Sequence, residues 1–318
     1  MEKAHYPVAG VDYPSTFAEF DSWFGDETAC RAFLVHLRWP EGFVCPRCGV
    51  QQAPWTTARG YLHCRACQGE VSPTAGTLFE RTRTPLRLWF LAIWFVTSQK
   101  YGVSALGLQR VLGLRRYDTA WTWLHKLRRG MVRPGRDRLS GVVEVDETYL
   151  GAAEPGVQGR ETECKAIVAV AVERKGRAWG RARLARVADV SGESLVPFVT
   201  QAVTPGAIVH TDGWTGYAGL GKAGYRHRVT NLSESILLPH EAMPGVHRIA
   251  SLLKRWLLGT HHGGIQPQHL DYYLDEFTFR FNRRGSASRG MLFYRLMEHA
   301  ASLGPTTYAQ LIGGRNEP

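Results

Sequence analysis

The chain has 318 residues, which is enough to bury a sizeable core and to form two or three domains. It carries 39 Lys and Arg residues against 28 Asp and Glu, a formal net charge of +11, so we expect an anionic polymer or surface as its partner. The longest apolar stretch, residues 86–96, is too short to span a bilayer, and the N-terminus lacks the basic run and apolar core of a signal peptide. These features argue against membrane-spanning and secreted proteins, and we expect a soluble, cytoplasmic one.

Apolar residues recur at helical spacing over residues 15–37, which predicts a helical lead-in over residues 1–38. We expect this segment to pack against whatever follows it. Two of the six cysteines, Cys30 and Cys164, stand alone in the sequence and are predicted to be small buried apolar residues rather than nucleophiles.

Two cysteine pairs follow, Cys45-Pro-Arg-Cys48 and Cys64-Arg-Ala-Cys67, with fifteen residues between them. Each pair bends the backbone so that two thiolates converge, and two such pairs close a tetrahedral zinc site with no open position. We therefore predict a zinc ribbon over residues 39–80, with structural Zn²⁺ bound by all four thiolates. Two disulfides are the alternative, although nothing else in the chain indicates secretion.

A helical region is predicted over residues 81–137. Thr84-Pro85 has the form of an N-cap followed by proline at the first helical position, and the apolar residues after it predict a buried helix. A short helix over residues 104–113 ends at a glycine, and a second helix begins near Asp118. Two short helices with a glycine-containing turn are typical of a helix-turn-helix.

Basic residues are concentrated on this helix pair and after it. Residues 110–138 contain nine Arg and Lys against two Asp. This favours DNA as the partner, and a solvated basic face is the alternative. The predicted DNA-binding residues are Arg115, Arg116, Lys126, Arg128 and Arg129.

The periodicity changes to strands after Pro134-Gly135, which predicts a catalytic domain over residues 138–300 and a tail over residues 301–318. Strands are predicted over 142–149, 166–172, 181–187 and 207–212, and helices over 193–203, 246–259 and 267–282. Residues 173–176 are expected to form a hairpin turn. The fold class is therefore α/β, a mixed sheet flanked by helices.

Asp146 lies at the end of one hydrophobic strand and Asp212 at the end of another. Carboxylates at the ends of neighbouring strands can hold a pair of divalent cations for in-line attack on a phosphodiester. Together with the strand order, this pair indicates a ribonuclease-H-like core that uses Mg²⁺ or Mn²⁺.

Such cores take a third ligand from a helix after the last strand, and residues 246–258 contain no carboxylate. His247 and Lys254 are seven residues apart there and share one helical face. We predict that His247 completes the cation site with Asp146 and Asp212; a helix-start histidine without a metal role is the alternative. Lesser candidates for the third ligand are Glu144, Glu147 and Glu241.

The order of these motifs resembles the bacterial zinc-ribbon transposases of the insertion-sequence 1595 family (ISXO-like), over residues 15–300. Besides the cysteine pairs and the helix pair, the resemblance rests on four stretches: Val143-Glu-Val-Asp-Glu-Thr-Tyr-Leu-Gly151, Thr211-Asp-Gly-Trp-Thr-Gly-Tyr217, Val246-His-Arg with Lys254-Arg-Trp-Leu-Leu-Gly-Thr-His-His-Gly263, and Tyr273-Leu-Asp-Glu-Phe-Thr-Phe-Arg-Phe-Asn-Arg-Arg284.

The resemblance implies a DNA transposase that binds double-stranded DNA at terminal inverted repeats, cuts the 3′ ends and joins them to target DNA. Asp146 and Asp212 would be its first two acids, His247 falls where relatives with a standard triad have Glu, and Lys254 matches the basic residue seven positions later. Cutting two ends implies at least a homodimer, associated with the nucleoid when bound to DNA.

The resemblance also leaves an alternative. Relatives with a similar pattern carry Asn where this chain has Leu252. If that position completes the site, the chain is a catalytically inactive transposase that acts as a sequence-specific DNA-binding protein. An RNA-directed ribonuclease is disfavoured by the two DNA-binding motifs in the front half.

Overall fold

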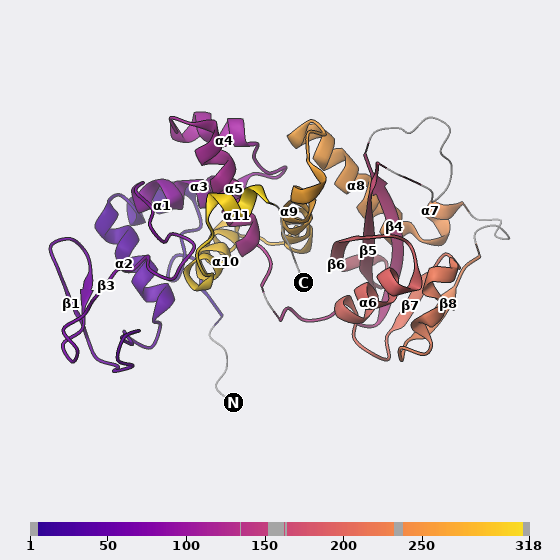
Figure 1. The fold of residues 1–318 in the computed structure, drawn as a ribbon, viewed down its shortest axis with the longest axis horizontal. Coiled ribbons are helices and arrows are strands. Elements are labelled where there is room, and N and C mark those ends of the chain that lie inside the picture. The colour runs from indigo at the N-terminus through magenta and orange to yellow at the C-terminus, as the bar shows by residue number, and fades with distance from the viewer. Residues whose placement is uncertain (1–5, 134, 152–161, 163, 232–237, 314–318) are drawn as a thin grey trace. The chain divides into compact units, whose positions relative to one another are not determined.

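The structure, a computed structural model, describes residues 6–133, 135–151, 162, 164–231 and 238–313. The chain divides into two compact units (Figure 1). Unit 1 contains residues 1–133 and 285–313, and unit 2 contains residues 134–284 and 314–318. No helix among the described residues is long and apolar enough to cross a membrane.

Unit 1 is built from helices and a small three-stranded sheet. Its helices are α1 (Phe17–Trp23), α2 (Glu27–Arg38), α3 (Leu86–Ser98), α4 (Ala105–Leu112), α5 (Tyr117–Gly130), α10 (Arg289–Ser302) and α11 (Tyr308–Ile312). Its strands are β1 (Trp55–Thr56), β2 (Leu62–His63) and β3 (Glu70–Val71), paired antiparallel in that order.

The helical lead-in forms two helices rather than one. The side chain of Thr16 caps α1 and the side chain of Asp26 caps α2, so the chain stops and restarts between them. Phe20 and Phe24 are buried and pack edge-on with centroids 5.1 Å apart. Each of them also packs against Phe293 of α10. An aromatic core therefore joins the start of the chain to a helix near its end.

The predicted buried helix is α3, but its cap differs from the one expected. Thr84 was expected at the N-cap, whereas the structure places Pro85 there without a side-chain cap. Instead the carboxylate of Glu27 in α2 accepts hydrogen bonds from the backbone N–H of Leu86 (2.9 Å) and Arg87 (3.3 Å). The Glu27 carboxylate thus accepts from two backbone N–H groups that have no partner within α3. Its negative charge also interacts favourably with the positive end of the α3 dipole.

The helix pair forms close to its predicted bounds. Ser104 accepts a hydrogen bond from Gly107 N–H and caps α4, which ends at Gly113 in the left-handed conformation (φ 62°). Most of α5 is packed against its surroundings, with buried residues along nearly its whole length. A helix enclosed in this way presents only its first turn and a few half-buried side chains to solvent.

Helix α10 belongs to unit 1, although the sequence placed residues 285–300 in the catalytic domain. Its Gly290 approaches Pro14 so closely that a Cβ atom there would lie 1.7 Å from the Pro14 carbonyl oxygen. Ala300 C=O accepts a hydrogen bond from Leu78 N–H (3.1 Å), and Gly130 of α5 faces Leu296. The long segment of unit 2 therefore ends at residue 284 rather than at 300, and the predicted tail contains α11.

Unit 2 contains a five-stranded sheet in the order β6-β5-β4-β7-β8. The first three strands are antiparallel neighbours, and β7 and β8 are added parallel to β4. The elements are β4 (Val142–Leu150), β5 (Ala166–Lys175), β6 (Ala178–Val187), α6 (Gly192–Ala202), β7 (Ile208–Thr211), η1 (Thr215–Leu220), β8 (Arg226–Val229), α7 (Pro239–Ala242), α8 (Pro244–His261), η2 (Pro267–His269) and α9 (Leu270–Asn282).

Both faces of this sheet are covered, which explains the near-continuous apolar run of β5. Its residues Val168, Val170 and Val172 pack in a cluster with α8 and α9. The alternate residues Ala169 and Ala171 pack with α6 and η1 on the opposite face. The mixed sheet flanked by helices is thus confirmed, and η1, β8 and α7 are elements that the sequence did not predict.

Candidate functional site

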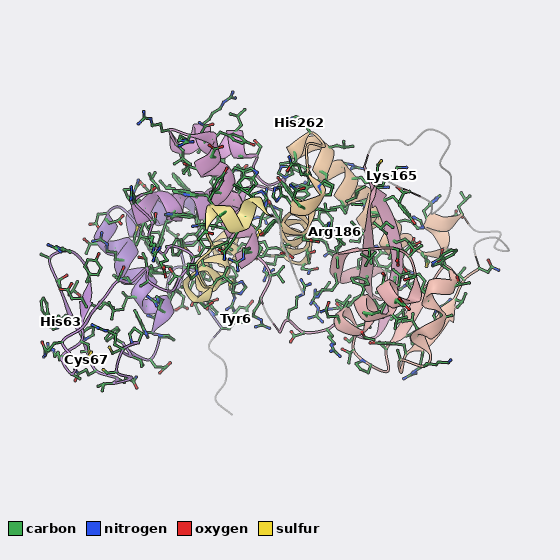
Figure 2. All side chains as sticks on the ribbon, in the orientation of Figure 1. Tyr6, His63, Cys67, Lys165, Arg186 and His262 are labelled. Carbon is green, nitrogen blue, oxygen red and sulfur yellow. The ribbon has the colours of Figure 1, made fainter. Side chains whose placement is uncertain are left out.

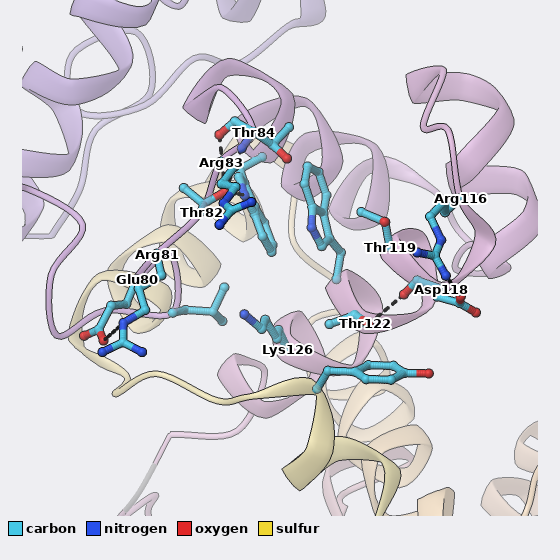
Figure 3. A pocket seen from close by; sticks show the side chains of 14 residues that line it. Glu80, Arg81, Thr82, Arg83, Thr84, Arg116, Asp118, Thr119, Thr122 and Lys126 are labelled. Carbon is cyan, nitrogen blue, oxygen red and sulfur yellow. Dashed lines mark hydrogen bonds and ion pairs between the residues drawn. The ribbon is translucent and has the colours of Figure 1, made fainter.

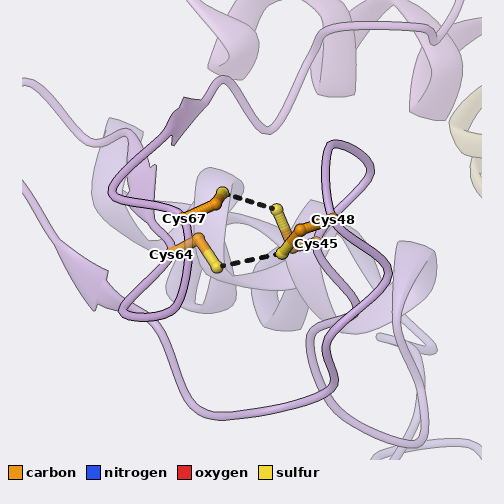
Figure 4. A group of neighbouring side chains, drawn as sticks. All are labelled: Cys45, Cys48, Cys64 and Cys67. Atoms are coloured by element: carbon orange, nitrogen blue, oxygen red, sulfur yellow. Dashed lines mark hydrogen bonds between the residues drawn. The ribbon is translucent and has the colours of Figure 1, made fainter.

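The four ribbon cysteines converge as the sequence predicts (Figure 4). Cys45 Sγ lies 3.7 Å from Cys67 Sγ, Cys48 Sγ lies 3.7 Å from Cys64 Sγ, and all four sulfurs lie within 4.8 Å of one another. These distances exclude disulfides, whose S–S length is about 2.05 Å. Four thiolates about 2.3 Å from one ion would be separated by about 3.8 Å at tetrahedral geometry. The cluster therefore fits structural zinc.

Two similar backbone turns bring the sulfurs together. In the first knuckle Gly49 N–H donates to Cys45 C=O (2.8 Å), and in the second Gln68 N–H donates to Cys64 C=O (3.0 Å). The residue after each second cysteine has a positive φ, 72° at Gly49 and 58° at Gln68. Cys67, labelled with His63 in Figure 2, therefore occupies the same place in its turn as Cys48 does in the other.

The two remaining cysteines differ from each other. Cys30 is buried, and burial raises the pKa of its thiol to about 12, with the Glu27 carboxylate adding to the shift, so it is an inert packing residue as expected. Cys164 was also expected to be buried, but it is exposed. Its place just before β5 explains the difference, because the sheet core begins only after it.

In unit 2, the parallel pairing of β4 and β7 brings Asp146 and Asp212 together. The register pairs Val142 with Ile208 and Glu144 with His210, so its continuation places Asp146 next to Asp212. Both side chains are partly buried. The sequence placed both acids at strand ends. Asp212 does follow the end of β7, but Asp146 is in the middle of β4, which continues to Leu150, so that expectation is wrong for Asp146.

Asp212 is oriented by a local turn. Its Oδ1 accepts a hydrogen bond from Trp214 N–H (3.0 Å), and Gly213 between them has φ 88°. Trp214 is held in turn, since its indole N–H donates to Val190 C=O (2.7 Å). This turn fixes the direction of the Asp212 side chain just after the end of β7.

His247 lies beside Asp146. His247 Nε2 is 3.8 Å from Asp146 Oδ2, and this nitrogen is buried without a hydrogen-bond partner among the described residues. Burial lowers the pKa of His247, and the charge of His240 lowers it further, against a smaller opposing effect of Asp212. A neutral imidazole nitrogen is a metal ligand. Ligand atoms that share one ion at about 2.1 Å lie roughly 3 to 4.2 Å apart, so the 3.8 Å separation fits a shared cation.

A third carboxylate joins these groups through Tyr217. The Tyr217 hydroxyl donates to Glu147 Oε2 (3.0 Å). The pKa of Tyr217 is raised well above its ordinary value, first by burial and then by the negative charges of Glu147, Asp146 and Asp212. One buried phenol thus experiences three carboxylates at once. Glu147 was only a lesser candidate, because it points to the opposite face of β4 from Asp146, and the sequence gave no indication of Tyr217.

These donor atoms do not yet converge as closely as the ribbon sulfurs. Among the described residues, the four cysteines are the one group of three or more His, Cys, Asp or Glu side chains whose ligand atoms all lie within 4.8 Å of one another. Asp146 and His247 form the close pair, and Asp212 acts on both His247 and Tyr217 through its charge. Asp212 is therefore near this pair through its charge without forming a three-ligand group with it in the described structure.

Glu144 holds the helix that carries His247. It is fully buried, and its Oε2 accepts hydrogen bonds from the backbone N–H of Gly245 (2.7 Å) and Val246 (3.3 Å) at the start of α8. Burial raises its pKa, while these two bonds favour the carboxylate. A Cβ atom on Gly245 would lie 2.8 Å from the carboxylate and 2.7 Å from Trp179. The start of α8 therefore packs against β4, and His247 directly follows the two residues that bond Glu144.

We expect Glu144→Ala to lower both stability and strand cleavage. The two N–H groups lose their acceptor inside the protein, which costs about 2 to 3 kcal/mol of unfolding free energy, and His247 loses its fixed position. Glu144→Gln keeps an acceptor oxygen and is expected to retain most of both. Urea unfolding and a cleavage assay on the same preparations measure the two effects. Full cleavage by Glu144→Ala would show that His247 is held by other contacts.

Leu252, Lys254 and Glu241 take different places. Leu252 packs partly buried against the hydrophobic cluster beneath α8 and α9, so it does not replace His247 beside Asp146. Lys254 is exposed and lines a hollow of about 530 Å³ with Tyr149 and other residues near the end of α8, where Figure 2 labels His262. The Glu241 carboxylate accepts from Leu238 N–H (3.0 Å) within its own exposed turn.

The predicted DNA-binding residues differ in their exposure to solvent. Arg115 and Arg116 are exposed before α5, and Lys126 and Arg129 are half-buried on it. The expectation for Arg128 is wrong in this structure, because its side chain is 1% exposed and its Nη1 lies 3.5 Å from His125 Nε2. A guanidinium in that position packs inside unit 1 and cannot reach a phosphate.

Comparison with known proteins finds a match for each of two parts of the chain. Residues 138–282 match the ISXO2-like transposase domain, and residues 25–70 match the transposase zinc-ribbon domain. A protein of the transposable element ISH50 of Halobacterium salinarum, described as uncharacterized, is 27% identical over 291 residues, 81% of this chain and 91% of that protein. An uncharacterized transposase-like protein of Haemophilus influenzae is 28% identical over 112 residues, 35% of this chain and 89% of that protein. No solved structure matches.

A zinc ribbon followed by a transposase domain defines the class, a transposase of the insertion-sequence type. Within that class the chain belongs to the insertion-sequence 1595 family of ISXO2-like transposases.

Proposed function

We propose that the chain binds the terminal inverted repeats of its insertion sequence, cuts the 3′ ends and joins them to target DNA. The observation that carries this proposal is the placement of His247 Nε2 3.8 Å from Asp146 Oδ2, with Asp212 directly after the neighbouring strand β7. The sheet supports a ribonuclease-H-like core, since an antiparallel meander is extended by two parallel strands.

In this proposal Asp146, Asp212 and His247 hold Mg²⁺ or Mn²⁺. The cation would stabilise charge at the scissile phosphate and activate the attacking oxygen. Glu144 fixes α8, and the turn at Gly213 fixes Asp212. Tyr217 donates to Glu147 and keeps that carboxylate directed away from Asp146. Lys254 is exposed on the same helix as His247 and is available to contact the DNA backbone.

In this proposal DNA binding and DNA cleavage belong to different units of the chain. The ribbon and the basic surface of unit 1 hold the element ends, and unit 2 carries out the chemistry. Two ends are cut, so we propose that at least two copies assemble on DNA. The zinc ion stabilises the ribbon and takes no part in cleavage.

Variants of His247 test the cation site. Imidazole suits Mn²⁺ better than the hard Mg²⁺ ion, so the wild type is expected to cut faster with Mn²⁺. His247→Glu is expected to keep activity and to shift the preference toward Mg²⁺. His247→Ala is expected to lose about 100-fold or more in cleavage rate, because several kcal/mol of transition-state stabilisation depend on the cation. The measurement is 3′-end nicking of end DNA in each metal.

Two controls accompany these variants. Binding of end DNA by His247→Ala is expected to equal that of the wild type. Leu252→Asn is expected to lower stability without raising cleavage, because it places an amide against a hydrophobic cluster. Normal cutting by His247→Ala would move the third ligand elsewhere. Activation of a silent wild type by Leu252→Asn would instead identify the chain as an inactive DNA-binding relative.

A further inference from the structure

A hollow of about 420 Å³ in unit 1 lies beside α5 and outside both sites described above (Figure 3). Its walls are the loop at residues 80–84, part of α3, one side of α5 and Tyr308 of α11. All of these segments belong to unit 1. The hollow is lined by charged groups, hydroxyls and aromatic rings.

Cations outnumber acids in this hollow. Arg81, Arg83, Arg116 and Lys126 line it, against Glu80 and Asp118. Two of the cations face acids, Arg81 with Glu80 (3.6 Å) and Arg116 with Asp118 (3.1 Å). Arg83 and Lys126 form no ion pair with the residues that the structure describes, and Figure 3 shows both extending toward the open space. The unbalanced charge is therefore localised on two side chains.

Lys126 is the more informative of the two because it is half-buried. Burial lowers its pKa, and the nearby charge of Arg129 lowers it further. An ammonium group kept from water in this way is stabilised by an anion at hydrogen-bond distance. The described part of unit 1 supplies no such anion, so the position suits one that arrives with a ligand.

The walls of the hollow are held together by ring stacking and hydrogen bonds. Trp89 and Trp123 stack with centroids 3.8 Å apart, and the Trp89 indole N–H donates to Thr82 Oγ1 (2.9 Å). The Thr82 hydroxyl also bonds the backbone of Thr84, accepting from its N–H (3.3 Å) and donating to its C=O (3.2 Å). The loop that carries Arg83 is thus fixed to α3, and little side-chain ordering remains for binding to impose.

A second hollow of about 420 Å³ continues the basic surface toward the ribbon. It shares residues 82–84 with the first and is lined by Arg31 of α2 and by Arg59, which lies between β1 and β2. A chain of phosphates following both hollows would pass Arg59, Arg31, Arg83 and Lys126 in turn. We call this set of four side chains the basic track.

We propose that the basic track binds the phosphate backbone of double-stranded DNA, with Lys126 and Arg83 in direct contact with phosphate oxygens. This rests on the proposed function and adds to it a binding site distinct from a recognition helix. Because α5 is enclosed along most of its length, its contribution to DNA binding comes from side chains at the hollow's wall and from its first turn. Contacts of this kind position DNA without reading its sequence.

The test measures how DNA affinity depends on salt for Lys126→Met and Arg83→Gln. Methionine keeps the packed stem of Lys126 and removes its charge. Each variant is expected to flatten the slope of log K against log salt by about 0.9, which corresponds to about eightfold weaker binding at 0.1 M salt. The loss is expected equally on end DNA and on unrelated duplexes, and Lys126→Arg is expected to restore binding.

The matched control is Lys100→Gln, which removes an exposed charge from the same unit but outside the hollow. Its slope is expected to equal the wild type's. In a second measurement, acetic anhydride labels lysines in the absence and presence of duplex DNA. DNA is expected to protect Lys126 and not Lys100, and inorganic phosphate at equal charge concentration is expected to protect it far less.

Several outcomes would overturn the basic track. Unchanged slopes for Lys126→Met and Arg83→Gln in a protein that still binds and cuts end DNA would refute it and leave the proposed function standing. Equal protection by free phosphate would identify a small-anion site, and preferential protection by duplex RNA would identify a different polymer. Flattened slopes in a protein that never cuts DNA would support the track and count against the proposed function.

Discussion

Replacement of Asp146 by alanine is expected to abolish DNA strand cleavage. Asp146 is the residue that His247 approaches and that neighbours Asp212 through the strand register, so its loss removes the group that both others depend on. If a cation there supplies several kcal/mol, the rate falls by about 10³-fold or more. The measurement is single-turnover 3′-end nicking of end DNA, with binding of the same DNA measured in parallel.

Two further variants make this result specific. Asp146→Asn keeps an oxygen that can accept the hydrogen bond from Glu147 N–H (2.9 Å), and it is expected to fold normally and still fail to cut. Glu193→Gln removes an exposed acid from the first turn of α6, and it is expected to cut like the wild type. Cleavage by Asp146→Asn at even a tenth of the wild-type rate would remove Asp146 from the catalytic site.

Replacement of Cys48 by serine is expected to cost the protein its zinc and the fold of its ribbon. The ribbon has a small apolar core of which two ligands, Cys45 and Cys64, are themselves part, so it depends on the ion for stability. Structural zinc contributes on the order of 10 kcal/mol, and a site with three thiolates retains only part of it. Zinc content by atomic absorption and the binding of end DNA are expected to fall together.

Cys164→Ser is the matched control, because it removes an exposed thiol outside the ribbon. It is expected to retain one equivalent of zinc and full DNA binding. Any residual nicking of short DNA by Cys48→Ser is expected to remain dependent on Asp146, since the ribbon takes no part in the chemistry. Full zinc occupancy in Cys48→Ser would contradict the four-cysteine site.

Local patterns were enough to predict most of the longer helices and strands and the convergence of the four cysteines. The ribbon ligands lie in two short CxxC stretches, and β5 has a near-continuous apolar run because the sheet is covered on both faces. The parallel pairing of β4 with β7 then brings Asp146 and Asp212 together. For the ribbon and for β5 a short stretch of sequence contains the physical cause of the structure, whereas the pairing of β4 with β7 joins segments that are far apart in the chain.

Interactions between distant segments could not be predicted in the same way. Glu144 bonds Gly245 across 101 residues, and Glu147 bonds Tyr217 across 70. Arg128 looked like its basic neighbours because charge along a helix does not reveal which face is enclosed. Its burial depends on what packs around α5 in the folded unit. Long-range packing therefore decided which of the candidate residues reach a site.

Because α10 completes unit 1, the two ends of unit 1 are synthesised far apart in time. The ribosome makes residues 134–284, with all the strands of the larger sheet, before it makes the helix whose Phe293 packs on Phe20 and Phe24. The second unit in the sequence can thus fold first. A messenger truncated before residue 289 would encode all the strands of the larger sheet together with a unit 1 that lacks α10.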